Sequence, residues 1–170
     1  MDIAEIQVRN SLSQELFMAL ELSPTLKAMK NSPVPDNNNK FRKVQDALKE
    51  FVARVPINIL EELSKKFDGI IIEASLRALS AAIIHESPGA TLWLFPHALR
   101  SSKSKLLGII AHEMAHLYIG PQIAKMTMTR INQPECEDEA DILASQWGFK
   151  EVFEIHLFPL VDSNRKYWPK

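Results

Sequence analysis

The chain has 170 residues, of which 46% are hydrophobic and 24% are charged, and these values are close to the average of globular domains. Twenty Lys and Arg residues against twenty-one Asp and Glu residues give a net charge of −1. Length, composition and charge therefore predict one compact domain, and they argue against a disordered, collagen-like or coiled-coil chain and against a surface-wide attraction to nucleic acid.

Cysteine usage and the first residues bear on the compartment. Cys136 is the only cysteine, so it has no partner for an intramolecular disulfide, which is typical of a reducing compartment. The start of the chain lacks the basic region and apolar stretch of a secretory signal. No run of about 18 uncharged apolar residues is present to span a membrane. We expect a cytoplasmic protein that binds neither membranes nor nucleic acid.

Residues 1–32 predict an N-terminal helical appendage. Apolar residues recur at helical spacing from Ile3 to Leu20, and the helix is expected to end near Leu22 because Pro24 disfavours its continuation. The two prolines and three consecutive asparagines between Asn31 and Asn39 predict a linker. We therefore expect two parts, an appendage over residues 1–32 that packs on or covers the rest, and a main domain over residues 33–170.

The main domain is expected to be rich in helix. Apolar spacing, capping residues and prolines predict helices over residues 41–55, 57–67, 103–119 and 134–146. Short apolar runs predict strands over residues 69–73 and 91–95, while the run 81–85 is compatible with a strand or a helix end.

The sequence His112-Glu113-Met114-Ala115-His116 lies inside the predicted helix 103–119. Histidines four residues apart project from one face of a helix and can bind the same metal ion. The side chain of Glu113 points about 100° further round the helix, where it can act on a water bound to that metal. The alternative is a core helix whose two histidines make ordinary hydrogen bonds.

A cluster of acids begins the next predicted helix. Glu137 and Asp141 are four residues apart and share one face, so Glu137 can be the third metal ligand and Asp141 can accept the other ring N–H of a ligand histidine. Glu135 and Cys136 are weaker alternative ligands. The other interpretation is that acids in a first helical turn only interact with the helix dipole.

The two motifs, H-E-M-A-H followed by E-D-E-A-D, resemble those of the zincin metallopeptidases of the gluzincin type. These enzymes pair H-E-x-x-H on one helix with E-x-x-x-D on the next. The small members look closest: minigluzincins, the peptidase domain of HtpX-like proteases and the ImmA/IrrE-type domains. The resemblance covers about residues 90–148 and includes the strand 91–95, which matches the edge strand before the active-site helix of that family. The transmembrane helices of HtpX-like proteins are missing, and residues 1–40 lack a recognisable helix-turn-helix.

The resemblance implies an α+β, zincin-like and helix-rich fold for residues 33–170, with a small, mostly antiparallel sheet packed on the active-site helix. It implies that His112, His116 and Glu137 bind zinc (Zn2+) and that Glu113 is the general base for attack of a zinc-bound water on the peptide bonds of a peptide or protein substrate. The strand 92–95 is then expected to pair with an extended substrate.

Two points stay open at this stage. A group that stabilises the oxyanion is expected, and His156, Tyr167 and Arg130 are the candidates, although His156 is also compatible with a packed core residue. The alternative function is a zinc-binding regulatory or interaction domain of zincin fold with little or no proteolytic activity. A third interpretation is a helical structural protein that binds no metal.

Overall fold

The computed structural model describes residues 3–66, 69–74, 81–86, 89–94, 96–119 and 134–157. The elements in chain order are α1 (Ile3–Ala19), β1 (Leu20–Leu22), α2 (Pro24–Lys30), α3 (Pro35–Arg54), α4 (Ile57–Lys66), β2 (Ile70–Ala74), β3 (Ala81–Glu86), β4 (Gly89–Leu94), α5 (Pro96–Arg100), α6 (Lys103–Ile119), α8 (Pro134–Gln146) and the 3-10 helix η1 (Lys150–Leu157). The described chain is thus rich in helix, as the sequence predicts.

The sheet has the strand order β1-β2-β4-β3. β1, β2 and β4 run parallel to one another, and only β3 is antiparallel to its neighbour β4. The expectation of a mostly antiparallel sheet is therefore wrong. The reason lies in the connections, because the three helices between β1 and β2 allow the return crossover that parallel strands require.

β4 lies inside the sheet rather than at its edge. Leu92 pairs with Ile72 of β2 on one side and with Ile83 of β3 on the other, so the interpretation of this strand as an edge that binds substrate is also wrong. Residues 90–92 are all buried, and burial without alternation is typical of a strand that is covered on both faces. Phe95, the last residue of the predicted strand, lies outside the described residues.

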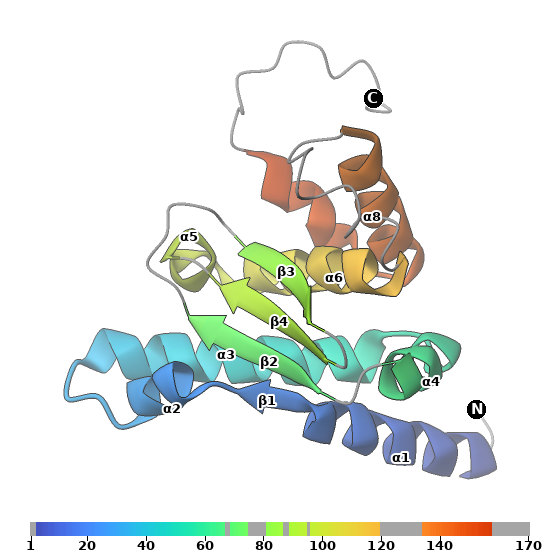
Figure 1. The fold of residues 1–170 in the computed structure, drawn as a ribbon, viewed down its shortest axis with the longest axis horizontal. Helices are drawn as coiled ribbons and strands as arrows, with labels where there is room; N and C mark the ends of the chain where they lie inside the picture. Colours follow the sequence, from blue (N-terminus) through green and yellow to red (C-terminus); the bar gives the residue numbers. More distant parts are fainter. Residues whose placement is uncertain are drawn as a thin grey trace.

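The helices α3 and α6 lie behind the sheet in the view of Figure 1 and pack against each other, while α8 and η1 lie beyond α6. α3 presents a buried stripe at helical spacing toward this layer, formed by Val44, Leu48 and Phe51 among others. The core continues through Ile72 and Leu92 of the sheet, whose side chains are fully buried. The sheet and α3 together form the support on which α6 rests.

The N-terminal segment contributes to the sheet and to the core. β1 pairs with β2, and Leu20 and Leu26 belong to the same core cluster as the sheet residues. The expected single helix ending near Leu22 is instead α1, β1 and α2, because Pro24 occupies the first turn of a helix that Ser23 caps. The Ser23 hydroxyl accepts a hydrogen bond from the Leu26 N–H over 3.2 Å.

Of the expected linker over residues 31–39, residues 31–34 connect α2 to α3, while residues 35–39 belong to α3. Asn37, Asn38 and Asn39 all lie in the first turns of α3. The Asn38 amide donates to the Lys30 carbonyl over 2.6 Å, and the Asn37 amide donates to the Ser32 hydroxyl over 3.1 Å. These side chains therefore tie the start of α3 to the end of α2, which a pattern of turn-forming residues does not reveal.

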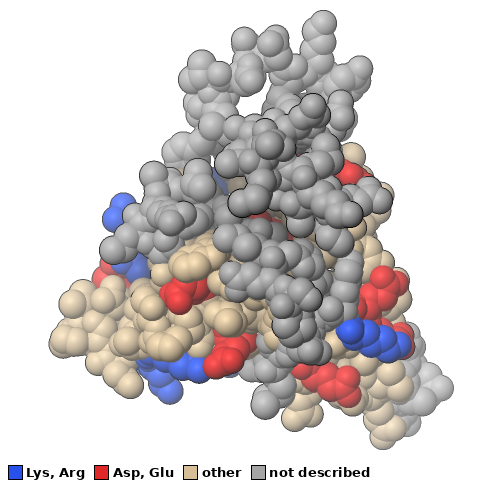
Figure 2. All heavy atoms as spheres, in the orientation of Figure 1, with Lys and Arg blue, Asp and Glu red and all other residues tan. Residues whose placement is uncertain are grey.

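The described surface carries mixed charges. In the face shown in Figure 2, the acidic and basic side chains of the described residues are interspersed and do not gather into one patch of a single sign. None of the helices that the structure describes combines the length and the apolarity needed to cross a membrane.

Candidate metal centre

The helix α6 carries the two histidines into the interior of the protein. It begins after Ser102, whose hydroxyl accepts a hydrogen bond from the Lys105 N–H over 3.1 Å. Every residue from Leu106 to Ala115 is buried, since the helix is covered by the sheet, α3, α8 and η1. His112 and Glu113 are therefore removed from solvent, with exposed fractions of 6% and 9%.

The helix α8 brings two acids to this part of α6. Glu137 and Asp141 lie one turn apart on α8, and Ala140 and Ala144 are fully buried. Small side chains allow two helices to approach closely. Asp141 is buried, while 40% of the Glu137 side chain stays exposed. The centre is thus closed on one side by α8 and open to solvent along Glu137.

Three side chains converge on one point. The His112 Nε2 lies 3.0 Å from the His116 Nε2 and 3.1 Å from the Glu137 Oε2, and the His116 Nε2 lies 3.7 Å from the Glu137 Oε1. Ligand atoms of His112, His116 and Glu137 all lie within 4.8 Å of one another. This buried group of two imidazoles and one carboxylate can hold a metal ion.

The spacing of these atoms suits a tetrahedral ion. Zinc–nitrogen and zinc–oxygen bonds of about 2.0–2.1 Å place tetrahedral ligand atoms about 3.3 Å apart. The distances of 3.0, 3.1 and 3.7 Å lie on both sides of that value. Two histidines and one glutamate are also a ligand set of catalytic zinc sites, in which the fourth position takes water or substrate. The residues therefore fit zinc in both chemistry and spacing.

Asp141 orients the first histidine. Its Oδ1 lies 2.7 Å from the His112 Nδ1, and a carboxylate at this position accepts the Nδ1–H bond. When the His112 ring is neutral, the lone pair of its Nε2 then faces His116 and Glu137. A carboxylate behind a ligand histidine fixes the ring and raises its basicity.

The acids make the centre favourable for positive charge. Burial lowers the pKa of His112, but the hydrogen bonds with Asp141 and Glu137 outweigh burial and raise the pKa of His112 to about 10. Burial raises the pKa of Glu137, but its contacts with His112 and His116 outweigh burial and hold this pKa well below its usual range. A proton or a metal cation supplies the charge that these acids stabilise.

Glu113 lies on α6 beside the first histidine, and its negative charge contributes to the raised pKa of His112. Asp141, although predicted only as a partner of a ligand, is as deeply buried as the ligand that it contacts. His156 belongs to η1, but its side chain lies outside the described part of the structure. The side chains of Glu135 and Cys136 lie outside it as well, as do residues Arg130 and Tyr167.

An aromatic pair lies where α6 packs against the end of α8. The ring of Tyr118, two residues after His116, meets the edge of the Trp147 ring with centroids 5.5 Å apart. Trp147 follows α8 directly and is buried. The pair therefore packs α6 against the C-terminal end of α8.

Comparisons with protein-family models, with curated proteins and with solved structures find no match to this chain. The chemistry of the site therefore rests on its own geometry.

Proposed function

We propose that this protein is a zinc-dependent metallopeptidase, similar to the gluzincins, that hydrolyses peptide bonds in peptide or protein substrates. One observation carries the proposal: the two Nε2 atoms of His112 and His116 and the carboxylate of Glu137 converge from two helices beside the buried Glu113. A scaffold helix has no need to gather two imidazoles and the two buried acids Glu113 and Asp141 at one point, because burial of polar groups is costly.

The residues have distinct roles in this proposal. His112, His116 and Glu137 hold zinc, which when bound acts as a Lewis acid that polarises a carbonyl and acidifies water. Asp141 keeps His112 in the tautomer whose Nε2 lone pair faces the centre. Glu113 accepts a proton from the attacking water and delivers it to the leaving nitrogen, which is general acid–base catalysis by one carboxylate.

A substrate strand is better accommodated by β3 than by β4. β4 is paired on both sides, while β3 ends the strand order of the described sheet. β3 also contacts α6, the helix of the two histidines. An extended peptide that pairs with the outer edge of β3 therefore lies on the side of the sheet nearest to the metal centre, and it gains main-chain hydrogen bonds with little demand on its sequence.

The test compares the wild type with His112→Ala, Glu113→Gln and the control Glu139→Gln, an exposed acid on α8. Elemental analysis of each purified full chain without added zinc is expected to give about one zinc per chain, lost only in His112→Ala. Hydrolysis of a fluorescently labelled unfolded protein is expected to fall by about 10²–10⁴-fold in Glu113→Gln. Glu139→Gln is expected to match the wild type in both measurements.

Two outcomes would overturn the proposal in different ways. A wild-type chain that takes up no zinc from micromolar solution at neutral pH would favour the helical structural protein. A chain that binds zinc through His112 but hydrolyses no peptide bond, or hydrolyses equally in Glu113→Gln, would favour the regulatory or interaction domain.

A further inference from the structure

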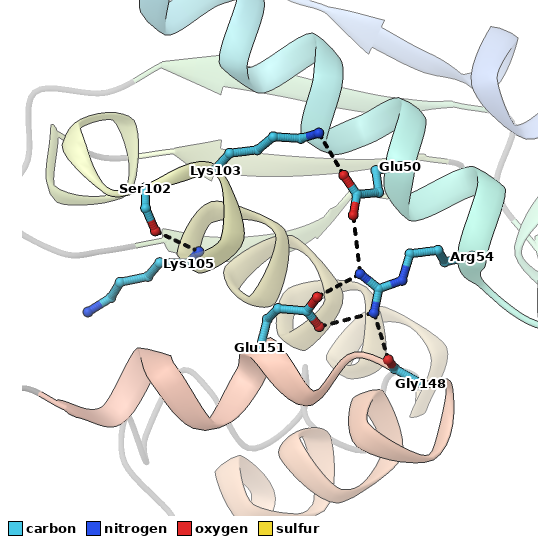
Figure 3. A network of polar contacts seen from close by, with 7 residues as sticks. All are labelled: Glu50, Arg54, Ser102, Lys103, Lys105, Gly148 and Glu151. Carbon is cyan, nitrogen blue, oxygen red and sulfur yellow. Dashed lines mark hydrogen bonds and ion pairs between the residues drawn. The ribbon is translucent and has the colours of Figure 1, made fainter.

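Arg54, which lies far from the two motifs in the sequence, connects the end of α3 to the segment that follows α8. Arg54 is the last residue of α3, and its guanidinium meets the Glu151 carboxylate with two bonds, from Nη1 to Oε1 over 2.6 Å and from Nη2 to Oε2 over 3.1 Å. The Nη2 also donates to the Gly148 carbonyl over 2.7 Å. Figure 3 shows these bonds from one guanidinium to Gly148, which follows α8, and to Glu151 of η1.

The same guanidinium has further partners that fix its position. Its Nη1 donates to the Glu50 Oε1 over 3.2 Å, and the other oxygen of Glu50 pairs with the Lys103 ammonium over 2.7 Å at the start of α6. The Arg54 guanidinium also lies over the Phe149 ring, 4.6 Å from its centroid. We call Glu50, Arg54, Lys103 and Glu151 the ion network. It joins α3 to the beginning of α6 and to the end of α8.

The partners of Arg54 lie where α8 ends. Gly148 has φ of +94°, a conformation that favours glycine, and the Phe149 N–H returns to the Ala144 carbonyl over 3.0 Å, as in a Schellman cap. A contact to the Gly148 carbonyl therefore holds the end of the helix that carries Glu137 and Asp141. Since α8 is one continuous helix, we expect a displacement of this end to displace the two acids as well.

Glu151 brings the network into contact with the histidine helix. A Cβ atom on Gly108 would lie 2.5 Å from the Glu151 carbonyl oxygen, so the backbone of η1 packs directly against α6 at that glycine. Gly108 is one helical turn before His112 and lies on the same face. The Arg54 guanidinium thus restrains a segment that touches α6 one turn before the first histidine.

We infer that Arg54 is a positioning residue for the metal centre, holding α8 and η1 against α6 so that Glu137 and Asp141 reach the two histidines. The inference rests on the metal centre of the proposed function. It requires no peptidase activity, because it concerns only how the ligands are brought together. The two-bond contact with a half-buried carboxylate suits arginine, whose planar fork fixes direction as well as charge.

The matched control is Arg9, which also binds near the end of α3 but from α1. Its Nη2 donates to the Ala53 and Val55 carbonyls, and it makes no described contact with α8 or η1. Arg54→Ala and Arg9→Ala therefore each remove one arginine from the same end of α3. Arg54→Lys keeps the positive charge but loses the planar group that makes two bonds with Glu151. Glu151→Gln removes the negative charge of that partner with little change in side-chain shape. Both variants can replace Arg54→Ala in the test if Arg54→Ala does not fold.

Zinc affinity of each full-length variant is measured by competition with a chelator, and thermal unfolding is measured without metal. We expect Arg54→Ala to lower zinc affinity measurably and by at most about tenfold, which is the lower end of the effect of a residue that contacts a ligand directly. We expect the zinc affinities of Arg54→Lys and Glu151→Gln to lie between those of Arg54→Ala and the wild type. Arg9→Ala is expected to keep the wild-type affinity even where its unfolding temperature falls. Wild-type affinity in Arg54→Ala, or an equal loss in Arg9→Ala, would overturn the inference.

A second measurement needs no metal. In a chain with nitrogen-labelled histidines, the Nδ1–H of His112 bonded to Asp141 is expected to give a slowly exchanging NMR signal that is absent in His112→Ala. We expect this signal to broaden or disappear in Arg54→Ala and to persist in Arg9→Ala. A signal unchanged in Arg54→Ala would overturn the inference. A wild-type chain without zinc affinity would overturn the proposed function instead, and this spectrum would still decide the role of Arg54.

Discussion

The metal centre and the ion network both join α6 to neighbouring helices through charged side chains, but they balance charge differently. In the ion network, two acids face two permanent cations, Arg54 and Lys103. In the metal centre, Glu137 contacts His112 and His116, and Asp141 contacts His112. His112 is buried, while Lys103 of the ion network is half exposed. Each acid of the network therefore has a permanent cation among its partners, whereas the described contacts of Glu137 and Asp141 include imidazoles, which carry a charge only when they bind a proton.

This difference separates a structural cluster from a binding cluster. Ion pairs near the surface are already neutralised, so they gain little from any ligand and mainly hold geometry. Acids that contact imidazole nitrogens stabilise a proton or a cation that binds there. Charge balance among the contacting side chains, more than the number of charged residues, thus distinguishes the two clusters.

The contact that joins the two clusters can be broken at Gly108. A Cβ atom there would also lie 2.7 Å from the Glu151 carbonyl carbon and 3.0 Å from the Val152 nitrogen, so η1 must move away from α6. We expect Gly108→Ala to lower the free energy of unfolding by about 1–3 kcal/mol, as for overpacked cores. Urea unfolding of the metal-free chain measures this change.

Whether Gly108→Ala lowers or raises the free energy of unfolding serves as the control for this prediction. In an open helix, replacement of glycine by alanine stabilises by about 0.5–1 kcal/mol. A stabilised Gly108→Ala chain would show that η1 does not press on α6, and it would remove the link between the ion network and the metal centre.

Asp141→Asn tests whether the negative charge of Asp141 in the metal centre contributes to zinc affinity. Asparagine keeps the size of the side chain and can still accept the His112 Nδ1–H bond, but it removes the negative charge. We expect zinc affinity to fall by about 10–100-fold, measured by competition with a chelator. Asp138→Asn, on the same helix but half exposed, is expected to keep the wild-type affinity. Equal affinities of the wild type and Asp141→Asn would mean that the buried charge does not serve the metal.

The smallest effect is expected in the ion network at low pH. The hydrogen bond from Arg54 lowers the pKa of Glu151 from 4.5, so the stabilisation is complete above that value and is lost as the pH falls through the lower pKa of the folded state. We expect the loss to be less than about 1 kcal/mol, because both side chains are partly exposed. Urea unfolding of the metal-free chain between pH 6 and about pH 3 measures it.

Glu151→Gln is expected to reduce the slope of stability against pH in this range. Glu61→Gln removes an exposed pair with Lys65 on α4 and is expected to leave the slope as it is in the wild type. Identical slopes for all three chains would show that Arg54 and Glu151 do not form a charge pair in solution.

The sequence predicted the elements of the site better than the arrangement of the sheet. The apolar pattern and caps predicted a helix over residues 103–119, and α6 has these bounds. Helical spacing is local, so the motif residues 112–116 and the acids of α8 could be placed before any fold was known. Strand neighbours depend on pairing across the chain, and the inner position of β4 required β2 and β3 to be known first.

Other features had signals that were weak or absent. Residues 90–92 are buried without alternation, as in a strand that is covered on both faces. The polar Thr91 interrupts the apolar pattern there, so no clear signal of the inner position of β4 is present in the sequence. Glu50 and Arg54 are spaced as a helical ion pair, but nothing local connects them to Glu151, 97 residues beyond Arg54. The asparagines of α3 match a turn in composition, and only the position of α2 explains why they begin a helix.

The pairing of β1 with β2 determines the order in which parts of the fold can form while the chain is synthesised. Leu20 pairs with Ile70, so the first strand leaves the ribosome well before its partner exists. Parallel pairing over such a separation forms slowly, because a long loop must close before any bond forms. The sheet therefore assembles only after α3 and α4 have been made, and the donors on α6 and α8 follow later still. The group of His112, His116 and Glu137 that can hold a metal ion is therefore complete only once α8 has been made, after both strands of the β1–β2 pair.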